Sequence, residues 1–333
     1  MPEDSIFFHL EKHLFKSYPE IRTTFFTVVG PISQYTRHQP FAFAEAIDYN
    51  DASIKFFRQL YADPRFEIAY HGWNHGIPGK ITEEFIQEFK SFASIEDAVK
   101  QTRTGLDVYR KVFGAECSGG KYGGWEYNQY ADTCIDRSGF KWWCRDWMEK
   151  DASAFVQSAY YEPQFFGANN VIAMPSTLHG NRWTPRQVDA LIADRQIIAV
   201  EEHMGALRPD GRIQTPNVFD DLERLRSLYR YLRSKNVWHA TATQIADYFE
   251  VYQNSRVSDI GTDRFRLHYR GKAAGNPITL VIQPSQIVKR KRLADAILIC
   301  PDGREIKGRK RAAGNGFIFS IAVLNGDYHY KEY

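Results

Sequence analysis

Cysteine is scarce in this sequence, and its four residues, Cys117, Cys134, Cys144 and Cys300, show no C-x-x-C spacing. That argues against a zinc ribbon or a disulfide framework, so we expect reduced thiols. Low-complexity tracts and internal repeats are also absent. With 43% hydrophobic and 15% aromatic residues, the composition is that of an ordinary globular protein rather than a disordered one.

Long apolar runs are missing as well. No stretch of the sequence approaches the roughly 18 apolar residues of a membrane span. The start, MPEDSIFFHLEKHLF, lacks the basic n-region and the apolar h-region of a signal peptide. For the chain as given we therefore expect a soluble, cytoplasmic protein without a membrane span; a chain that continues upstream of Met1 would change that expectation.

The formal charge of +3 is unevenly distributed. From Ser255 onward there are fifteen Lys and Arg but seven Asp and Glu residues, and the runs VKRKR, ending at Arg292, and KGRKR, ending at Arg311, carry much of the excess. Such a region can attract an acidic partner; a solvated β-domain face is the alternative. Neither run is interleaved with the aromatic residues that single-strand binding requires, so we do not expect a nucleic-acid partner.

Two domains are predicted from the order of the patterns. Up to residue 254, strand-like runs such as FEIAY at 66–70 alternate with helical patterns, which is typical of an α/β fold with a mainly parallel sheet. Residues 255–333 instead show strands separated by Gly, Pro and Asp turns, which predicts a small antiparallel β-domain of the sandwich type. The predicted domains are residues 1–254 and 255–333.

One helical stretch is unusually long. Residues 81–114 have a helical pattern, with Thr82 as the expected N-cap and Gly114 as the stop. This length predicts one long helix, or two with a bend between them.

The stretch FEIAYHGWNHG places two histidines after a predicted strand. Ligands of parallel α/β sheets meet the carboxyl ends of strands. His71 and His75 are four residues apart and can share one cation, and Gly72 and Gly76 permit a tight backbone that turns both rings inward. Hydrogen-bonded histidines in a polar loop are the alternative. A catalytic metal would also need a third protein ligand and an open place for water.

Acid–base candidates follow a later predicted strand. His203, at the end of IIAVEEH, is a candidate general acid, and His179 in PSTLHGNRW is a second. Hydrogen-bonded histidines at strand ends are the alternative for both. For Glu201 and Glu202 the alternative is a solvated or helix-dipole role.

Several motifs resemble the polysaccharide deacetylase family, carbohydrate esterases of the nodulation-protein type. RTTFFTVVG, HGWNH, AVEEHM and WHATATQIADYF are similar, in this order, to the family's second strand, metal motif, late catalytic histidine, and closing strand and helix. The resemblance covers about residues 1–250 and indicates a divergent member. It implies a distorted (β/α)7 barrel and metal-dependent removal of N- or O-acetyl groups from a carbohydrate. The implied cofactor is a divalent ion, zinc foremost, with cobalt, nickel or manganese as alternatives.

The resemblance also implies roles for single residues. His71 and His75 would be metal ligands and His203 the general acid. Glu3 and Asp4 lie near the position of the family's Asp pair, which implies Glu3 as general base and Asp4 as third metal ligand. No predicted strand precedes them, so the alternatives are a polar terminus with the family's first strand upstream of Met1, or a reshaped start.

The stretch GGKYGG departs from the family's Arg-Pro-Pro-Tyr-Gly motif. Gly119 stands at the Arg position, and Lys121 brings a cation two residues later that can pair with a carboxylate, although without the bidentate geometry of Arg. The backbone N–H of Tyr122 is the implied oxyanion donor. Gly72 likewise replaces the Ser or Thr of the metal motif.

Three tryptophans in predicted loops, Trp73, Trp125 and Trp183, are candidates for stacking on sugar rings, with packing as the alternative. Two other functions stay open. One is a catalytically impaired glycan-binding pseudoenzyme; the other is a metal-free amidohydrolase on the same barrel, acting on a small cyclic amide.

Overall fold

The computed structural model describes residues 6–31, 45–80, 82–147, 163–204, 215–272, 275–282, 296–310 and 316–332. It divides the chain into two compact units, Met1–Thr243 and Gln244–Tyr333. The helix α7, Ala242–Gln253, therefore belongs mostly to the second unit, whereas the sequence pattern predicted a boundary after residue 254. Among the described residues, no helix has the length and apolar character needed to cross a membrane.

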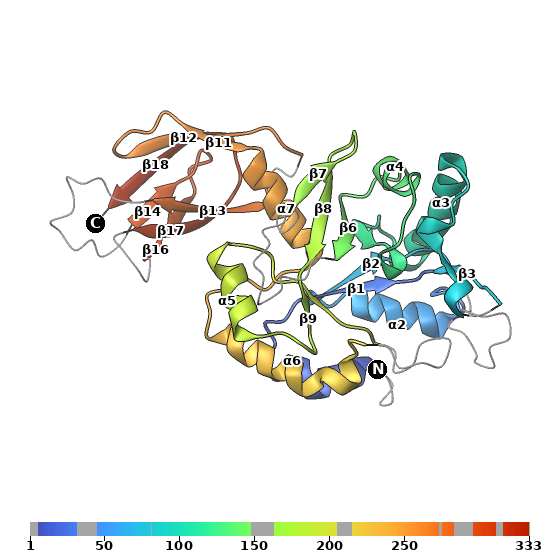
Figure 1. Ribbon diagram of the computed structural model, residues 1–333. Coiled ribbons are helices and arrows are strands. Elements are labelled where there is room, and N and C mark those ends of the chain that lie inside the picture. Colours follow the sequence, from blue (N-terminus) through green and yellow to red (C-terminus); the bar gives the residue numbers. More distant parts are fainter. Residues whose placement is uncertain are drawn as a thin grey trace. The chain divides into compact units, whose positions relative to one another are not determined.

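A curled six-stranded sheet forms the centre of the larger unit (Figure 1). Its strands, in their order across the sheet, are β1 Thr23–Thr27, β2 Phe66–Tyr70, β5 Gly119–Lys121, β6 Trp142–Trp147, β8 Val171–Ser176 and β7 Gln164–Phe166. The first five are parallel, and β7 is antiparallel to β8. Two further pairs are β9 Leu178–His179 with β10 Val200–Glu201, parallel, and β3 Gly76–Ile77 with β4 Ile86–Gln87, antiparallel.

Helices follow most strands of this unit. The α-helices are α1 Ile6–Leu10, α2 Asp51–Tyr61, α3 Ile95–Phe113, α4 Ala131–Arg137, α5 Pro185–Ala193 and α6 Val218–Arg233. Shorter helical turns are η1 Glu11–Phe15, η2 Thr82–Glu84, η3 Glu88–Lys90 and η4 Gly123–Trp125. The helices α2, α3, α5 and α6 begin after Asn50, Ser94, Thr184 and Asn217, whose side chains accept hydrogen bonds from first-turn amides.

Strand alternation separates the two faces of β2. Ile68 and Tyr70 are fully buried in the core that the helices cover, and the Tyr109 hydroxyl on α3 donates to the Ile68 carbonyl at 2.8 Å. Because successive strand residues point to opposite faces, Glu67 and His71 share the other, inner face. Glu67 is held there by Thr24 and Thr243, at the opposite end of β2 from His71.

The predicted helix over 81–114 is wrong in its first half. Helix α3 begins at Ile95, with Ser94 as its N-cap, and ends as predicted at Gly114, whose φ of 68° is left-handed. The residues before it form η2, β4 and η3 instead, and the predicted N-cap Thr82 lies in η2. The physical reason is a tertiary contact, because the carboxylate of Glu88 is bound by backbone amides of the preceding histidine loop.

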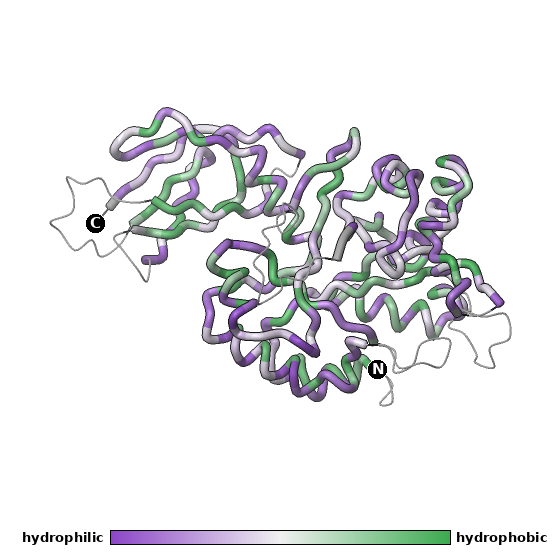
Figure 2. The backbone as a smooth tube through the Cα atoms, in the orientation of Figure 1, coloured by the Kyte–Doolittle hydropathy of each residue, from purple (hydrophilic) through white to green (hydrophobic). Residues whose placement is uncertain are grey.

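The second unit consists of two antiparallel sheets. The larger has the strands β11 Ser255–Ser258, β12 Arg264–Tyr269, β18 Gly326–Glu332, β14 Ala296–Ile299 and β15 Glu305–Lys307; the smaller has β13 Pro277–Ile282, β17 Phe317–Ala322 and β16 Arg309–Lys310. Figure 2 shows apolar residues along β13 and β17, and Leu298, Phe319 and Tyr328 have no exposed surface. The predicted fold class, an α/β fold of the distorted-barrel type followed by a small antiparallel β-domain, is confirmed.

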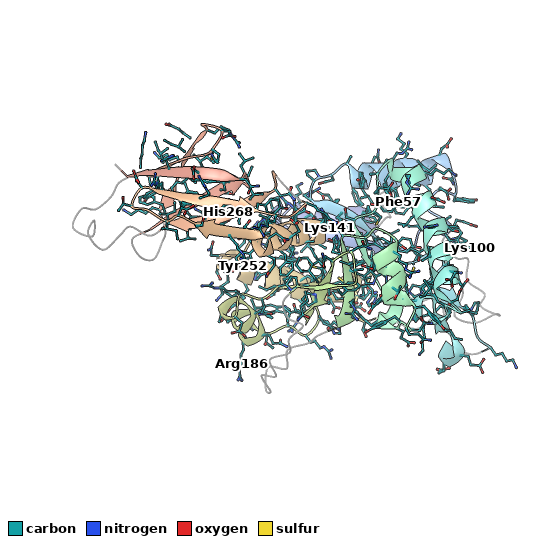
Figure 3. All side chains as sticks on the ribbon, turned by 90° about the horizontal axis from the view of Figure 1, so that it is seen from above. Phe57, Lys100, Lys141, Arg186, Tyr252 and His268 are labelled. Atoms are coloured by element: carbon teal, nitrogen blue, oxygen red, sulfur yellow. The ribbon has the colours of Figure 1, made fainter. Side chains whose placement is uncertain are left out.

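Basic side chains alternate with apolar ones on β12. Arg264, Arg266 and His268 are exposed, whereas Leu267 is buried, and Figure 3 shows His268 on this strand. Arg266 is paired with Asp327. The run VKRKR ending at Arg292 lies outside the described residues, as does Arg311 itself.

Candidate active site

His71 directly follows β2 and enters the inner face of the larger unit. Its amide donates to the Thr27 carbonyl at 2.9 Å, and its Nδ1 lies 3.0 Å from the carbonyl oxygen of Lys121. A carbonyl only accepts hydrogen bonds, so Nδ1 carries the hydrogen and Nε2 keeps its lone pair. Burial, together with the charges of His75 and Lys121, holds the pKa of His71 well below its usual range, so the ring is neutral near pH 7.

The loop between β2 and β3 is built around the carboxylate of Glu88. Glu88 is 1% exposed and accepts hydrogen bonds from the amides of Trp73, Asn74 and His75 at 2.8, 2.8 and 2.9 Å. Its own amide donates to the His75 carbonyl at 3.0 Å. Burial raises the pKa of Glu88, and the backbone hydrogen bonds oppose that rise. These bonds hold His75 at a φ of 70°, a conformation that is uncommon for a residue other than glycine.

The two imidazoles have a geometry that a single cation can use. The ring centroids of His71 and His75 lie 5.3 Å apart, and two imidazoles on one tetrahedral ion with N–metal bonds of ~2.0–2.1 Å have centroids about 5 Å apart. The hydrogen bond from His71 Nδ1 to a carbonyl is the outer-shell contact that metal-binding histidines usually make. Among the described residues no group of three His, Cys, Asp or Glu side chains forms a metal site. The predicted ligand Asp4 and the predicted base Glu3 lie outside the described residues.

Lys121 pairs with a carboxylate. In the comparison with the Arg-Pro-Pro-Tyr-Gly motif, Lys121 stands at the position of the second Pro. Its Nζ forms a salt bridge to Oε1 of Glu201 at the end of β10, and 10% and 9% of the two side-chain surfaces are exposed. The ammonium lies 4.1 Å from the ring centroid of Trp125, a cation–π contact that covers it. The sequence identified the cation but assigned Glu201 no role at the site.

His203 is held by the segment that leads into α6. Its Nδ1 lies 2.9 Å from the Pro216 carbonyl, which makes Nδ1 the donor and leaves Nε2 as the nitrogen available for proton transfer. The charge of His203 is among those that lower the pKa of His71, so the rings share one electrostatic site. His179, on β9 beside Glu201, has its pKa lowered mainly by burial and by Arg182.

The remaining predicted residues differ in accessibility. Tyr122 is fully buried, its hydroxyl donates to Asp132 at 2.7 Å, and its amide faces the Cys144 carbonyl at a long 3.5 Å. Trp183 is 8% exposed and packs between α5 and α6, with Nε1 donating to the Arg224 carbonyl at 3.0 Å. That burial gives Trp183 a packing role. Trp73 and Trp125 are half-buried.

Two site residues were missed by sequence reasoning, Glu88 and Glu201. Glu88 lay inside the predicted helix over 81–114 and was given no role of its own, and for Glu201 only the alternative of a solvated or helix-dipole role was stated. The signal that could have identified Glu201 is strand alternation, which places it on the same face as His203.

No family model matches the chain, and no curated protein matches it. Among solved structures, a family 4 acetyl xylan esterase from Clostridium thermocellum in complex with a cobalt ion is 13% identical, covers 74% of this chain and 85% of its own, and has a TM-score of 0.38. The Xyl-CE4 domain of a xylanase from the hindgut metagenome of Trinervitermes trinervoides is 9% identical, with coverages of 74% and 84% and a TM-score of 0.39. Puue allantoinase is 17% identical, with coverages of 73% and 72% and a TM-score of 0.46. At these values function has to be argued from the residues of this chain.

Proposed function

We propose that this protein is a metal-dependent hydrolase that removes acetyl groups from a carbohydrate. The observation that carries the proposal is the pair of His71 and His75, with a carbonyl-bound Nδ1 on His71 and ring centroids 5.3 Å apart. His203, on the same inner side, presents Nε2 for proton transfer. Two imidazoles placed to bind one cation, together with a third, that of His203, positioned for proton transfer, suit the hydrolysis of an amide or ester.

A divalent ion would be held by His71 and His75, with Asp4 proposed as third ligand and zinc as the first candidate metal. When bound, it supplies Lewis-acid polarisation of the acetyl carbonyl and lowers the pKa of water. His203 gives a proton to the leaving nitrogen or oxygen, and Glu3 is the base that the resemblance implies. Trp73 and Trp125 are proposed to contact the sugar.

A second candidate is a metal-free amidohydrolase acting on a small cyclic amide. The observation that favours it is the buried ammonium of Lys121, which can polarise a carbonyl and whose charge lowers the pKa of His71. A cation already present beside the imidazoles repels a second one.

Metal analysis separates the two candidates. We expect the purified protein, never exposed to chelator, to hold about one divalent ion, and His71→Ala with His75→Ala to lose it. A matched control is His9→Ala with His13→Ala, because these rings are also four residues apart, with centroids at 4.7 Å, but lie on α1 and η1; this variant should keep its metal. Wild-type protein without metal that hydrolyses a cyclic amide would favour the second candidate, and protein that binds an oligosaccharide without releasing acetate would favour a pseudoenzyme.

The exposed basic residues of β12 are proposed to contact an acidic partner. Arg264 and His268 are exposed on one face, and attraction to a polyanion depends on such unburied charge. Binding of the full chain to an acidic polysaccharide should weaken with added salt and with Arg264→Gln.

A further inference from the structure

Glu201 has one carboxylate oxygen in a salt bridge and one without a partner. Oε1 binds Lys121, whereas Oε2 is buried and has no hydrogen-bond partner among the described residues. The side chain is 9% exposed. Leaving a buried charged oxygen unsatisfied is costly, and such exceptions are typical of functional sites, where the partner is supplied by a ligand or water.

The direction of this carboxylate follows from strand alternation. Glu202 points to the side of Gly180 and Leu225, since a Cβ at Gly180 would collide with its carboxylate. Neighbouring strand residues face opposite sides, so Glu201 and His203 both point to the inner side. Lys121 lies there too, on β5.

Lys121 links this carboxylate to the histidine pair. Its side chain binds Glu201, and its carbonyl oxygen accepts the hydrogen of His71 Nδ1 at 3.0 Å. The Trp125 ring covers the ammonium at 4.1 Å from the centroid, which limits the access of bulk water to the salt bridge. One residue thus fixes the positions of a metal-ligand candidate and an ionisable oxygen.

We propose that Glu201 is the carboxylate that accepts the proton of the attacking water, with Lys121 as the residue that positions it. This inference rests on the proposed function and replaces Glu3 as the base. In the hydrolysis of an acetamide, a water O–H bond breaks and its proton passes to Oε2 of Glu201 as the new C–O bond forms. The C–N bond then breaks as His203, in its imidazolium form, gives the proton on Nε2 to nitrogen. The proton taken up by Glu201 then returns to His203 Nε2 through water, and the products are acetic acid and the amine.

The test compares Glu201→Gln with Glu202→Gln, the same change one residue away on the opposite face. Acetate release is measured with metal-loaded full-length protein on an N-acetylated chitooligosaccharide and an O-acetylated xylooligosaccharide. We expect Glu201→Gln to lower kcat by about 10²- to 10⁴-fold, the usual contribution of a general base, with KM and bound metal unchanged. Glu202→Gln should stay within about twofold of wild type.

Removing one member of a buried ion pair can destabilise the fold, so a second variant is needed. Lys121→Met with Glu201→Gln leaves no unpaired charge and should fold while remaining inactive. Glu201→Ala should regain activity when formate is added, because a free carboxylate can take the place of the missing one; a purely structural role would give no such rescue.

Four outcomes would overturn the inference. If Glu201→Gln keeps kcat within tenfold of an active wild type, or loses its metal together with its activity, Glu201 is not the base while the proposed function stands. If activity is lost but formate fails to restore Glu201→Ala, the role is structural. If wild type releases no acetate from either oligosaccharide, the proposed function itself fails, and this inference with it.

Discussion

The carboxylate of Glu88 occupies the space that a side chain at Gly72 would need: a Cβ at residue 72 would lie 2.5 Å from Glu88 Oε2. Gly72 also has a φ of +103°, which favours glycine. The replacement of Ser or Thr at this position and the burial of Glu88 are therefore one arrangement, in which the carboxylate binds three loop amides.

Glu88→Ala should lower the free energy of unfolding by about 3 kcal/mol, since three partly buried amides lose their acceptor and each unsatisfied group costs about 1–3 kcal/mol. Glu88→Gln, which keeps one acceptor oxygen, should lose less. Urea unfolding measures both. Glu84→Ala is the control, because Glu84 accepts a single hydrogen bond, from the exposed amide of Lys80. Loss of that bond should cost about 0.5 kcal/mol or less. An equal effect of the Glu84 and Glu88 variants would contradict the assignment.

The lowered pKa of His71 makes stability depend on pH. The unfolded chain takes up a proton near the ordinary pKa of 6.5, whereas folded His71 takes it up only well below. The contribution of His71 to the free energy of unfolding is thus fully present above pH 6.5 and is lost as the pH falls toward the pKa of His71 in the folded protein. Metal-free wild type should lose up to about 1.4 kcal/mol per pH unit below 6.5 more than His71→Asn. Urea unfolding at several pH values measures the difference, and parallel curves would refute it.

Glu202 should have the opposite pH dependence. Burial, with the charges of Asp221 and Glu201, raises its pKa from 4.5 to about 8, and neither oxygen has a hydrogen-bond partner among the described residues. The contribution of Glu202 to the free energy of unfolding is therefore fully present below pH 4.5 and is lost as the pH rises through about 8. Glu202→Gln should therefore be more stable than wild type by about 1–3 kcal/mol at alkaline pH and nearly equal to it at pH 4.5. Glu223→Gln, at a side chain 79% exposed, is the control and should show little change at either pH.

Gly105 lets α3 approach β2, since a Cβ there would collide with the Tyr70 hydroxyl. Gly105→Ala should destabilise by about 1–3 kcal/mol through overpacking, despite the gain of up to ~1 kcal/mol in helix propensity. Thr104→Ala, at the exposed neighbour, should change stability by about 0.5 kcal/mol or less. Thermal unfolding compares the two variants. If Gly105→Ala is more stable than wild type, Tyr70 can move aside without loss of stability, and the prediction is wrong.

The parts of the site that the sequence predicted are local. Strand β2 ends at Tyr70 as the alternation of FEIAY indicates, and His71 and His75 follow it. The failures are the two carboxylates. The residues around Glu88 have a helical pattern of polar and apolar positions. The side chain of Glu88, however, binds loop amides thirteen to fifteen residues earlier in the chain, and a local pattern of hydrophobicity carries no information about such a contact.

What the sequence by itself determined is the alternation of strands and helices, the stop of α3 at Gly114 and the position of two histidines at a strand end, because these depend on neighbours within a few residues. Only the tertiary structure decided that Lys121 meets Glu201, eighty residues away. The fold brings β5 of the six-stranded sheet to β10 of the separate β9–β10 pair, and burial at that point makes an ion pair the only inexpensive way to keep both charges.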